Sequence, residues 1–235
     1  MDGPAESFDA PETQSPQPLF AIDCARPLLV ASFAQPVTVL SWATARPGRQ
    51  LARRVVWLEV KDADLPPDVD PAALLDARLE EAGLHDAVAM MTARDVRRHH
   101  VAVARSGDIT AQCLATAGLS NAGRVGTACG ACSPVGTINL LAAVSAPLTE
   151  AALLEAVSIA TQARTAAVMD CAYETPGGVA TGTGTDCIAV ACPAEGEAAP
   201  FAGLHTPVGE ALGAAVYEAV RAGTREWIDG RSTKR

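Results

Sequence analysis

Short β-prone runs alternate with segments of helical spacing along most of the chain, and this alternation constrains the fold more than any other feature. The β-prone runs predict strands over 28–33, 36–42, 54–60, 86–91, 101–105, 109–117, 137–145, 166–170 and 186–192. The first two runs are expected to pair with each other, and the Ser106-Gly-Asp108 turn is expected to close a second hairpin. Two adjacent hairpins imply antiparallel pairing, so the pattern predicts one layered α/β or α+β domain whose mixed sheet is flanked by helices.

Capping residues place the helices between these strands. Asp70, Thr92, Thr149 and Thr206 each precede a segment of helical spacing, and their side-chain oxygens can accept hydrogen bonds from the free amides of a first turn. We therefore expect helices over 70–83, 92–98, 149–165 and 206–221.

The chain length and the ends of the sequence set the domain organisation. A chain of 235 residues with 49% hydrophobic residues can bury one sizeable core. Residues 1–18 are polar and contain proline, which predicts a flexible tail before a domain over 19–230. No basic and apolar signal segment opens the chain, and no run approaches the roughly 20 apolar residues of a membrane span. The seven cysteines are an odd number and do not indicate a disulfide framework, so we expect a cytoplasmic protein.

Charge and aromatic content argue against nucleic acid as a partner. Asp and Glu outnumber Lys and Arg by 27 to 18, which gives a net charge of −9, and aromatic residues make up only 4% of the chain. A surface that neutralises phosphates needs an excess of cations, and single strands are commonly held by stacking on aromatic rings.

The most unusual segment is a run of alternating glycine and threonine that ends in a carboxylate. Gly182 and Gly184 would let a ligand approach the backbone closely, while Thr181, Thr183 and Thr185 could bind polar substrate groups. Asp186 closes the run at the start of a strand, where it could serve as a general base or a metal ligand. A flexible surface hairpin would explain the same pattern.

Two further segments carry polar groups that could take part in catalysis. His205 lies just outside the start of the predicted last helix and Glu210 lies one turn inside it, at an end that could hold an oxyanion. Asn121 and Asn139 lie in glycine-punctuated turns and could donate to a carbonyl. A helix cap with an exposed histidine, and asparagines bonded to their own backbone, are the alternatives.

Cys129 and Cys132 are spaced as in redox and zinc motifs. No second pair of ligands accompanies them at a suitable spacing, and cysteine in an alanine-rich chain often packs as a small apolar residue. The sequence therefore leaves their role open.

Several segments in a fixed order resemble the adenosylcobinamide amidohydrolase (CbiZ-type) family. The matching segments are Met91–Val96, Leu119–Ala122 with Arg124–Gly126, Gly136–Asn139, Thr161–Ala167, Ala180–Asp186 and His205–Glu210. The resemblance implies hydrolysis of the amide that joins aminopropanol to the corrin ring, which yields adenosylcobyric acid for cobalamin salvage. It also implies a corrinoid substrate, and a homo-oligomer is one possibility.

The resemblance raises the functional interpretation of Asp186, His205, Glu210, Asn121 and Asn139. Asp186 or Glu210 would be the base, His205 would protonate the amine, and the asparagines with the amides of 182–185 would hold the oxyanion. No cofactor is certain, and a divalent metal held by Asp186, His205 and Glu210 is a second way to activate water.

The sequence departs from the family pattern at three places. Trp42–Arg49 replaces a glycine-rich turn, Trp57 stands where an asparagine is usual, and Thr127 with Cys129–Cys132 replaces a common aspartate. These departures motivate two alternatives, namely a corrinoid-binding protein without catalysis and an amidohydrolase of another bulky amide.

Overall fold

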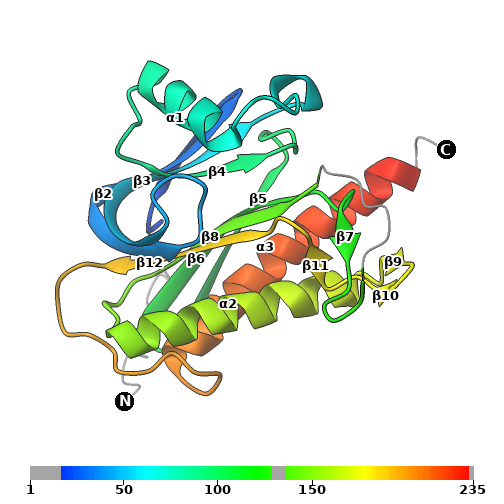
Figure 1. Ribbon diagram of the computed structural model, residues 1–235. Helices are drawn as coiled ribbons and strands as arrows, with labels where there is room; N and C mark the ends of the chain where they lie inside the picture. The colour runs from blue at the N-terminus through cyan, green and yellow to red at the C-terminus, as the bar shows by residue number, and fades with distance from the viewer. Residues whose placement is uncertain (1–16, 129–135, 233–235) are drawn as a thin grey trace, which may run out of the picture.

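One strongly curved mixed sheet organises the computed structural model, which describes residues 17–128 and 136–232 (Figure 1). The sheet has eight strands in the order β4-β3-β2-β12-β8-β6-β5, with β1 added alongside β2. The strands are β1 Ala21–Ala25, β2 Leu28–Ser41, β3 Gly48–Glu59, β4 Val88–Thr92, β5 His99–Ser106, β6 Ile109–Ala117, β8 Ile138–Val144 and β12 Cys187–Pro193. The β3–β4 and β8–β12 pairs are parallel and the other pairs are antiparallel, which confirms the predicted mixed sheet.

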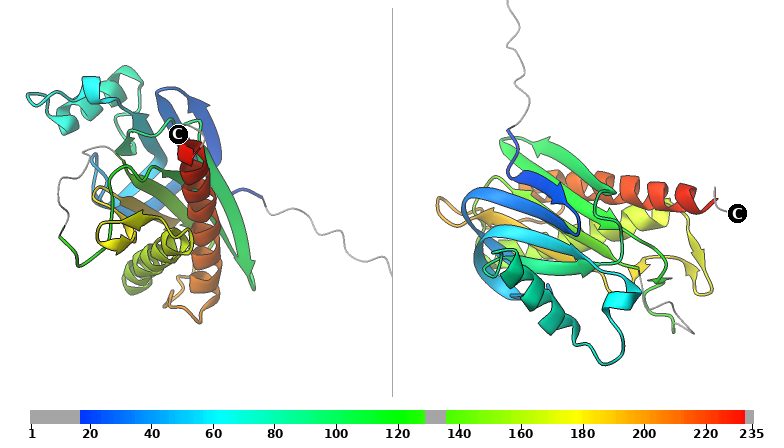
Figure 2. Two further views of the ribbon diagram at one scale, coloured as in Figure 1. Left: turned by 90° about the vertical axis from the view of Figure 1, so that its right-hand side faces the viewer. Right: turned by 90° about the horizontal axis from the view of Figure 1, so that it is seen from above.

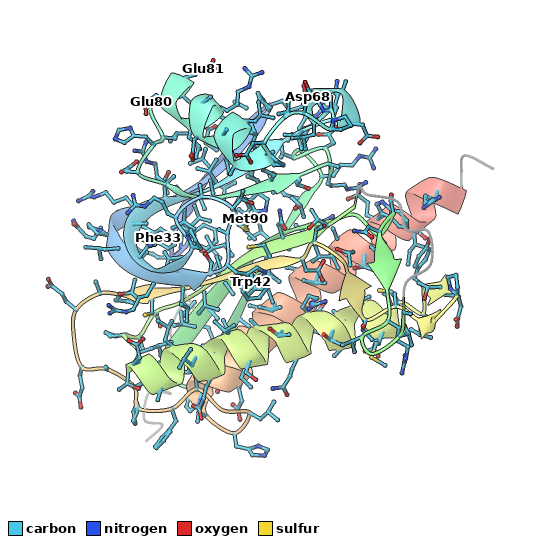
Figure 3. The ribbon with its side chains drawn as sticks, in the orientation of Figure 1. Phe33, Trp42, Asp68, Glu80, Glu81 and Met90 are labelled. Atoms are coloured by element: carbon cyan, nitrogen blue, oxygen red, sulfur yellow. The ribbon has the colours of Figure 1, made fainter. Side chains whose placement is uncertain are left out.

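The helices lie on the convex face of this sheet. They are α1 Pro71–Glu81, α2 Glu150–Asp170 and α3 Pro207–Ser232, with a short 3-10 turn at Asp62–Asp64. Figure 2 shows α2 and α3 side by side, and both pack on the half of the sheet formed by β12, β8, β6 and β5. The α1 helix covers the outer side of β3 and β4 through Leu75 and Leu79, whereas Glu80 and Glu81 lie on its outer surface and Asp68 is exposed in the loop before it (Figure 3). The predicted helical flanks of a single sheet are therefore confirmed.

The concave face of the sheet closes on itself without a helix. Side chains from β3 and β4 meet side chains from β6, β8 and β12 there, and Phe33, Trp57 and Met90 belong to this inner core. The curvature depends on β2, where the pairing with β3 shifts register between Ser32 and Val37. Such a bulge bends a strand and increases its twist.

Local chemistry explains several confirmed element boundaries. Asp70 Oδ1 accepts from the Ala72 amide at 3.0 Å, and Thr149 and Thr206 cap α2 and α3 in the same way. Gly107, with a φ of 55°, allows the tight turn between β5 and β6.

Four sequence predictions of local structure are wrong. Segments 28–33 and 36–42 do not pair with each other, because they form one bulged strand whose two halves both pair with β3. Segment 92–98 is not a helix: Thr92 Oγ1 accepts from the Arg94 amide, but the chain turns instead of continuing. Segment 166–170 is the end of α2, in which Ala167 and Val168 are buried helical residues. The last helix runs past 221 to 232.

Some predictions lie outside the described residues. These include most of the predicted tail over 1–18, and Cys129 with Cys132. In the described part of the chain, no helix is both long and apolar enough to span a membrane.

Candidate active site

A pocket of about 920 Å³ opens at the end of the sheet where β6 stops and β8 and β12 begin. Three segments line most of it: the loop after β6, the last turns of α2, and the long connection from α2 to β12. A small ladder of β7 (Ala122–Gly123) with β11 (Gly182–Thr183) joins the loop after β6 to the connection, and β9 (Glu174–Thr175) with β10 (Gly178–Val179) forms a hairpin within the connection. The volume lies in the upper part of the range typical of small-molecule sites.

Asp186 anchors the glycine-threonine segment against the rest of the pocket wall. Its Oδ1 accepts from the Ile138 amide at 3.0 Å and from the Thr183 hydroxyl. Its Oδ2 accepts from the Thr183 amide at 3.0 Å and from Nη1 of Arg164 at 2.6 Å. The side chain is only 7% exposed, so all of its strong acceptor positions are occupied and shielded. These four hydrogen bonds tie the glycine-threonine segment to α2 and to the start of β8.

Arg164 is a site residue that sequence analysis missed. It projects from α2 into the pocket wall, is 13% exposed, and also donates from Nη1 to the Thr181 carbonyl at 2.9 Å. Its Nε is buried and has no hydrogen-bond partner. The available sequence signal was that Arg164 is the single basic residue of α2. Because Nε is buried, a contact with a bound oxygen would come from Nη2, which makes no hydrogen bond within the described residues.

The glycines of the run make room for side chains. A Cβ on Gly182 would lie 1.8 Å from Nη1 of Arg164, and a Cβ on Gly184 would lie 2.9 Å from Nδ2 of Asn121. The sequence predicted that these glycines let a ligand approach the backbone closely. Their packing against Arg164 and Asn121 is the contact that the structure shows.

The pocket collects only some of the predicted substrate-binding residues. Thr181, Gly182, Thr183, Gly184 and Asn121 all line it. The hydroxyl oxygen of Thr181 accepts from the Val125 amide at 2.8 Å. By contrast, the Asn121 side chain makes no hydrogen bond within the described residues, which leaves its amide free to meet a ligand.

Thr185 and Asn139 lie outside the pocket lining. The Thr185 hydroxyl donates to the Gly136 carbonyl at 3.0 Å. Asn139 is 1% exposed, donates from Nδ2 to the Met91 carbonyl at 2.7 Å, and accepts from the Thr137 hydroxyl at 3.1 Å. Both side chains connect strands and loops beneath the site, and the structure gives Asn139 no route to a substrate carbonyl.

His205 and Glu210 lie at the other end of α2 from the pocket. The Ala202 amide donates to Glu155 in the first half of α2, nine positions before Arg164, which corresponds to roughly 14 Å along the helix axis. Glu210 accepts from the Ser106 hydroxyl at 2.5 Å, at the far tip of the β5–β6 hairpin, and His205 is exposed. Figure 1 shows the start of α3 on the opposite side of the molecule from β7, β9, β10 and β11. The structure therefore does not join Asp186, His205 and Glu210 into one catalytic or metal-binding group.

Among the residues that the structure describes, few metal-binding or thiol groups lie around the pocket. Within residues 17–128 and 136–232, no group of three or more His, Cys, Asp or Glu side chains is placed to hold a metal ion. Burial, and to a smaller extent the neighbouring Asp186 charge, raise the pKa of the Cys187 thiol to about 12. That thiol is therefore protonated near neutral pH.

The lining of the pocket contains one carboxylate from the described residues. Glu174 belongs to β9 and is exposed, and its side chain makes no hydrogen bond or ion pair with the described residues. Unlike Asp186, it has unoccupied acceptor positions next to the pocket.

The fold and the pocket define a single-domain α/β protein with an arginine-containing pocket of small-molecule size. The sequence model of a family described as adenosylcobinamide amidohydrolase (CbiZ) matches residues 13–232. The adenosylcobinamide amidohydrolase of Halobacterium salinarum is 38% identical over 185 residues, which cover 74% of this chain and 75% of that protein. The chain belongs to the adenosylcobinamide amidohydrolase family.

Two solved structures are similar at low sequence identity. The PH0078 protein of Pyrococcus horikoshii OT3 is 12% identical, with a TM-score of 0.45 over 83% of this chain and 76% of that one. The L-aminopeptidase D-Ala-esterase/amidase of Ochrobactrum anthropi is 15% identical, with a TM-score of 0.38 over 87% and 82%. At these scores neither likeness adds to the family assignment.

Proposed function

We propose that this protein hydrolyses the aminopropanol amide of adenosylcobinamide in the pocket between α2 and the β6–β7 and β11–β12 loops. The observation that carries the proposal is that family-like segments converge on one pocket. Three of the family-like segments, Leu119–Gly126, Thr161–Ala167 and Ala180–Asp186, are far apart in sequence and line or directly support this one pocket. Two others, Met91–Val96 and Gly136–Asn139, meet directly beneath it through Asn139.

The polar groups of the pocket suit amide hydrolysis. An amide carbonyl that is attacked by water develops negative charge on its oxygen, and fixed hydrogen-bond donors lower the barrier. Arg164 is held by Asp186 and Thr181, and the Asn121 side chain lines the same pocket without a hydrogen bond to the described residues. These two side chains are our proposed oxyanion donors.

Glu174 is our proposed base. It would take a proton from the attacking water as the new C–O bond forms, and return that proton to the nitrogen as the C–N bond breaks. Asp186 then acts as a positioning residue, because its carboxylate fixes Arg164 and Thr183.

Product analysis tests the function. Purified protein is incubated with adenosylcobinamide, with and without a chelator, and adenosylcobyric acid and 1-amino-2-propanol are measured by mass spectrometry. Both products are expected. Binding of the corrinoid without products would identify a binding protein, and faster cleavage of a cobalt-free amide would identify a different substrate.

The chelator arm addresses the divalent metal, which stays a prediction from the sequence. The cytoplasmic location and a homo-oligomer also stay predictions.

A Glu174→Gln variant tests the base. We expect kcat to fall about 100-fold while the dissociation constant for the corrinoid stays nearly unchanged. An unchanged kcat would remove Glu174 from the mechanism.

A further inference from the structure

Tyr173 is the one aromatic side chain that the described residues contribute to the pocket lining. The remaining walls consist mainly of glycine, threonine, alanine and a few polar side chains. A ligand with a large planar ring system would therefore meet an aromatic face at this position alone within the described lining.

The ring of Tyr173 is fixed by the helix behind it. It packs edge-to-face on Trp227 of α3, with ring centroids 5.4 Å apart and an interplanar angle of 86°. Trp227 is itself 8% exposed and lies 4.8 Å below the guanidinium of Arg231. Such aromatic pairs add stability beyond their buried area, so the ring of Tyr173 is pre-positioned before a ligand arrives.

The backbone before Tyr173 is also arranged for this placement. Ala172 has a φ of 51°, a left-handed conformation that costs energy for any residue with a Cβ. This residue ends α2 and turns the chain so that Tyr173 reaches the pocket instead of continuing the helix. The Tyr173 carbonyl then accepts from the Ala180 amide at 2.9 Å, which ties the base of the β9–β10 hairpin.

We propose that Tyr173 is a specificity-determining residue that packs its ring against the planar conjugated part of the corrinoid. The inference rests on the proposed function, because it takes a corrinoid as the ligand. Two parts of adenosylcobinamide offer this chemistry, the corrin macrocycle and the adenine of its adenosyl group. Both would present a flat π surface to the tyrosine, and a ring-on-ring contact tolerates the loss of the hydroxyl.

The test compares Tyr173→Phe and Tyr173→Leu with Tyr217→Leu. Tyr217 is the only other tyrosine of the chain and is bonded to Asp170 on the surface, so its replacement is a matched control. Dissociation constants are measured for adenosylcobinamide and for cyanocobinamide, which lacks adenine, together with KM and kcat. Near-UV circular dichroism checks that each variant keeps its tertiary packing.

We expect Tyr173→Phe to bind within about twofold of the wild type and Tyr173→Leu to bind about tenfold more weakly, with kcat nearly unchanged. Weakening with both corrinoids would assign the contact to the corrin ring, and weakening with adenosylcobinamide alone would assign it to adenine. A folded Tyr173→Leu that binds as tightly as Tyr217→Leu would overturn the proposal. So would a loss of kcat in Tyr173→Phe, because it would indicate a role for the hydroxyl.

The two proposals fail in different ways. A wild-type protein that binds corrinoid without cleaving it would contradict the hydrolase, while the binding constants would still decide the role of Tyr173. A wild-type protein that binds neither corrinoid would overturn both.

Discussion

Asp186 and Arg164 form a buried ion pair in which Oδ2 of the carboxylate lies 2.6 Å from Nη1 of the guanidinium. The pair joins α2 to the start of β12, across 22 residues that include the β9–β10 hairpin and β11. Replacing Asp186 with Asn would leave the Arg164 charge buried without a counter-ion. We expect the free energy of unfolding to fall by about 3 kcal/mol, measured by urea titration.

The control for this ion pair is Glu218→Gln. Glu218 is 60% exposed and lies 3.4 Å from Arg221 on the surface of α3. An exposed ion pair of this kind contributes little to stability, so the free energy of unfolding should change by less than about 0.5 kcal/mol. Equal losses in the two variants would show that the buried pair has no special structural role.

The glycines of the run give a second stability prediction. Gly182→Ala would place a methyl group 1.8 Å from Nη1 of Arg164, so the guanidinium must move away from Asp186. We expect a loss of about 1–3 kcal/mol in unfolding free energy and a loss of turnover. Gly203→Ala is the matched control, since its Cβ would meet nothing within 4 Å. Normal stability and turnover in Gly182→Ala would contradict the packing role.

His205 and Glu210 supply a prediction of little effect. Because both lie at the opposite end of α2 from the pocket, His205→Ala and Glu210→Gln should keep kcat/KM within about threefold of the wild type. General acids and bases contribute about 100-fold or more, so steady-state assays separate the two cases. A loss of that size in either variant would return the residue to the mechanism.

Acid stability should depend on Glu226. Burial alone would raise the pKa of this carboxyl, but hydrogen bonds from His100 and Arg98 and the charge of Arg94 lower it overall. A carboxylate with a lowered folded pKa stabilises the protein above its unfolded pKa of about 4.3, and this contribution is lost as the pH falls through the folded pKa. In thermal or urea unfolding at pH 3–5, Glu226→Gln should therefore show a shallower loss of stability with acid than the wild type. Parallel curves of stability against pH for the two proteins would mean that the contacts of Glu226 with His100, Arg98 and Arg94 do not contribute to stability in acid.

The layers of helices and strands could be predicted from the sequence better than the pairing of the strands. Capping residues such as Asp70 and Thr149 act locally, so the starts of α1 and α2 could be predicted. The bulge in β2 could not be predicted, because the Gln35-Pro36 pair indicates a turn between two strands equally well. Likewise the alanine-rich end of α2 has no local stop signal before Asp170, and only its burial under α3 shows that the helix continues.

Prediction of the site had a similar limit. The glycine-threonine run and Asn121 were found because their composition is unusual, and they do line the pocket. Arg164, Tyr173 and Glu174 were missed because their residue types are ordinary; Arg164 reaches the pocket from α2, and Tyr173 and Glu174 reach it from the connection after that helix. Of the departures from the family pattern, Thr127 lines the pocket, whereas Trp57 is wholly buried in the inner core.

The remaining departure is the segment Trp42–Arg49. Trp42, labelled in Figure 3, is 49% exposed and donates its indole N–H to the Asp186 carbonyl at 2.8 Å. It therefore supports the same anchor from outside the pocket.

The most direct test of the account is the cleavage of adenosylcobinamide by the wild type, Arg164→Met and Arg78→Met, followed by mass spectrometry of adenosylcobyric acid. Arg78 lies on α1, where it pairs with Glu81 at the surface, and is the control for loss of an arginine. We predict product from the wild type and Arg78→Met, and at least about 100-fold slower formation by a folded Arg164→Met. Equal rates in all three proteins would show that the amide is not cleaved in this pocket.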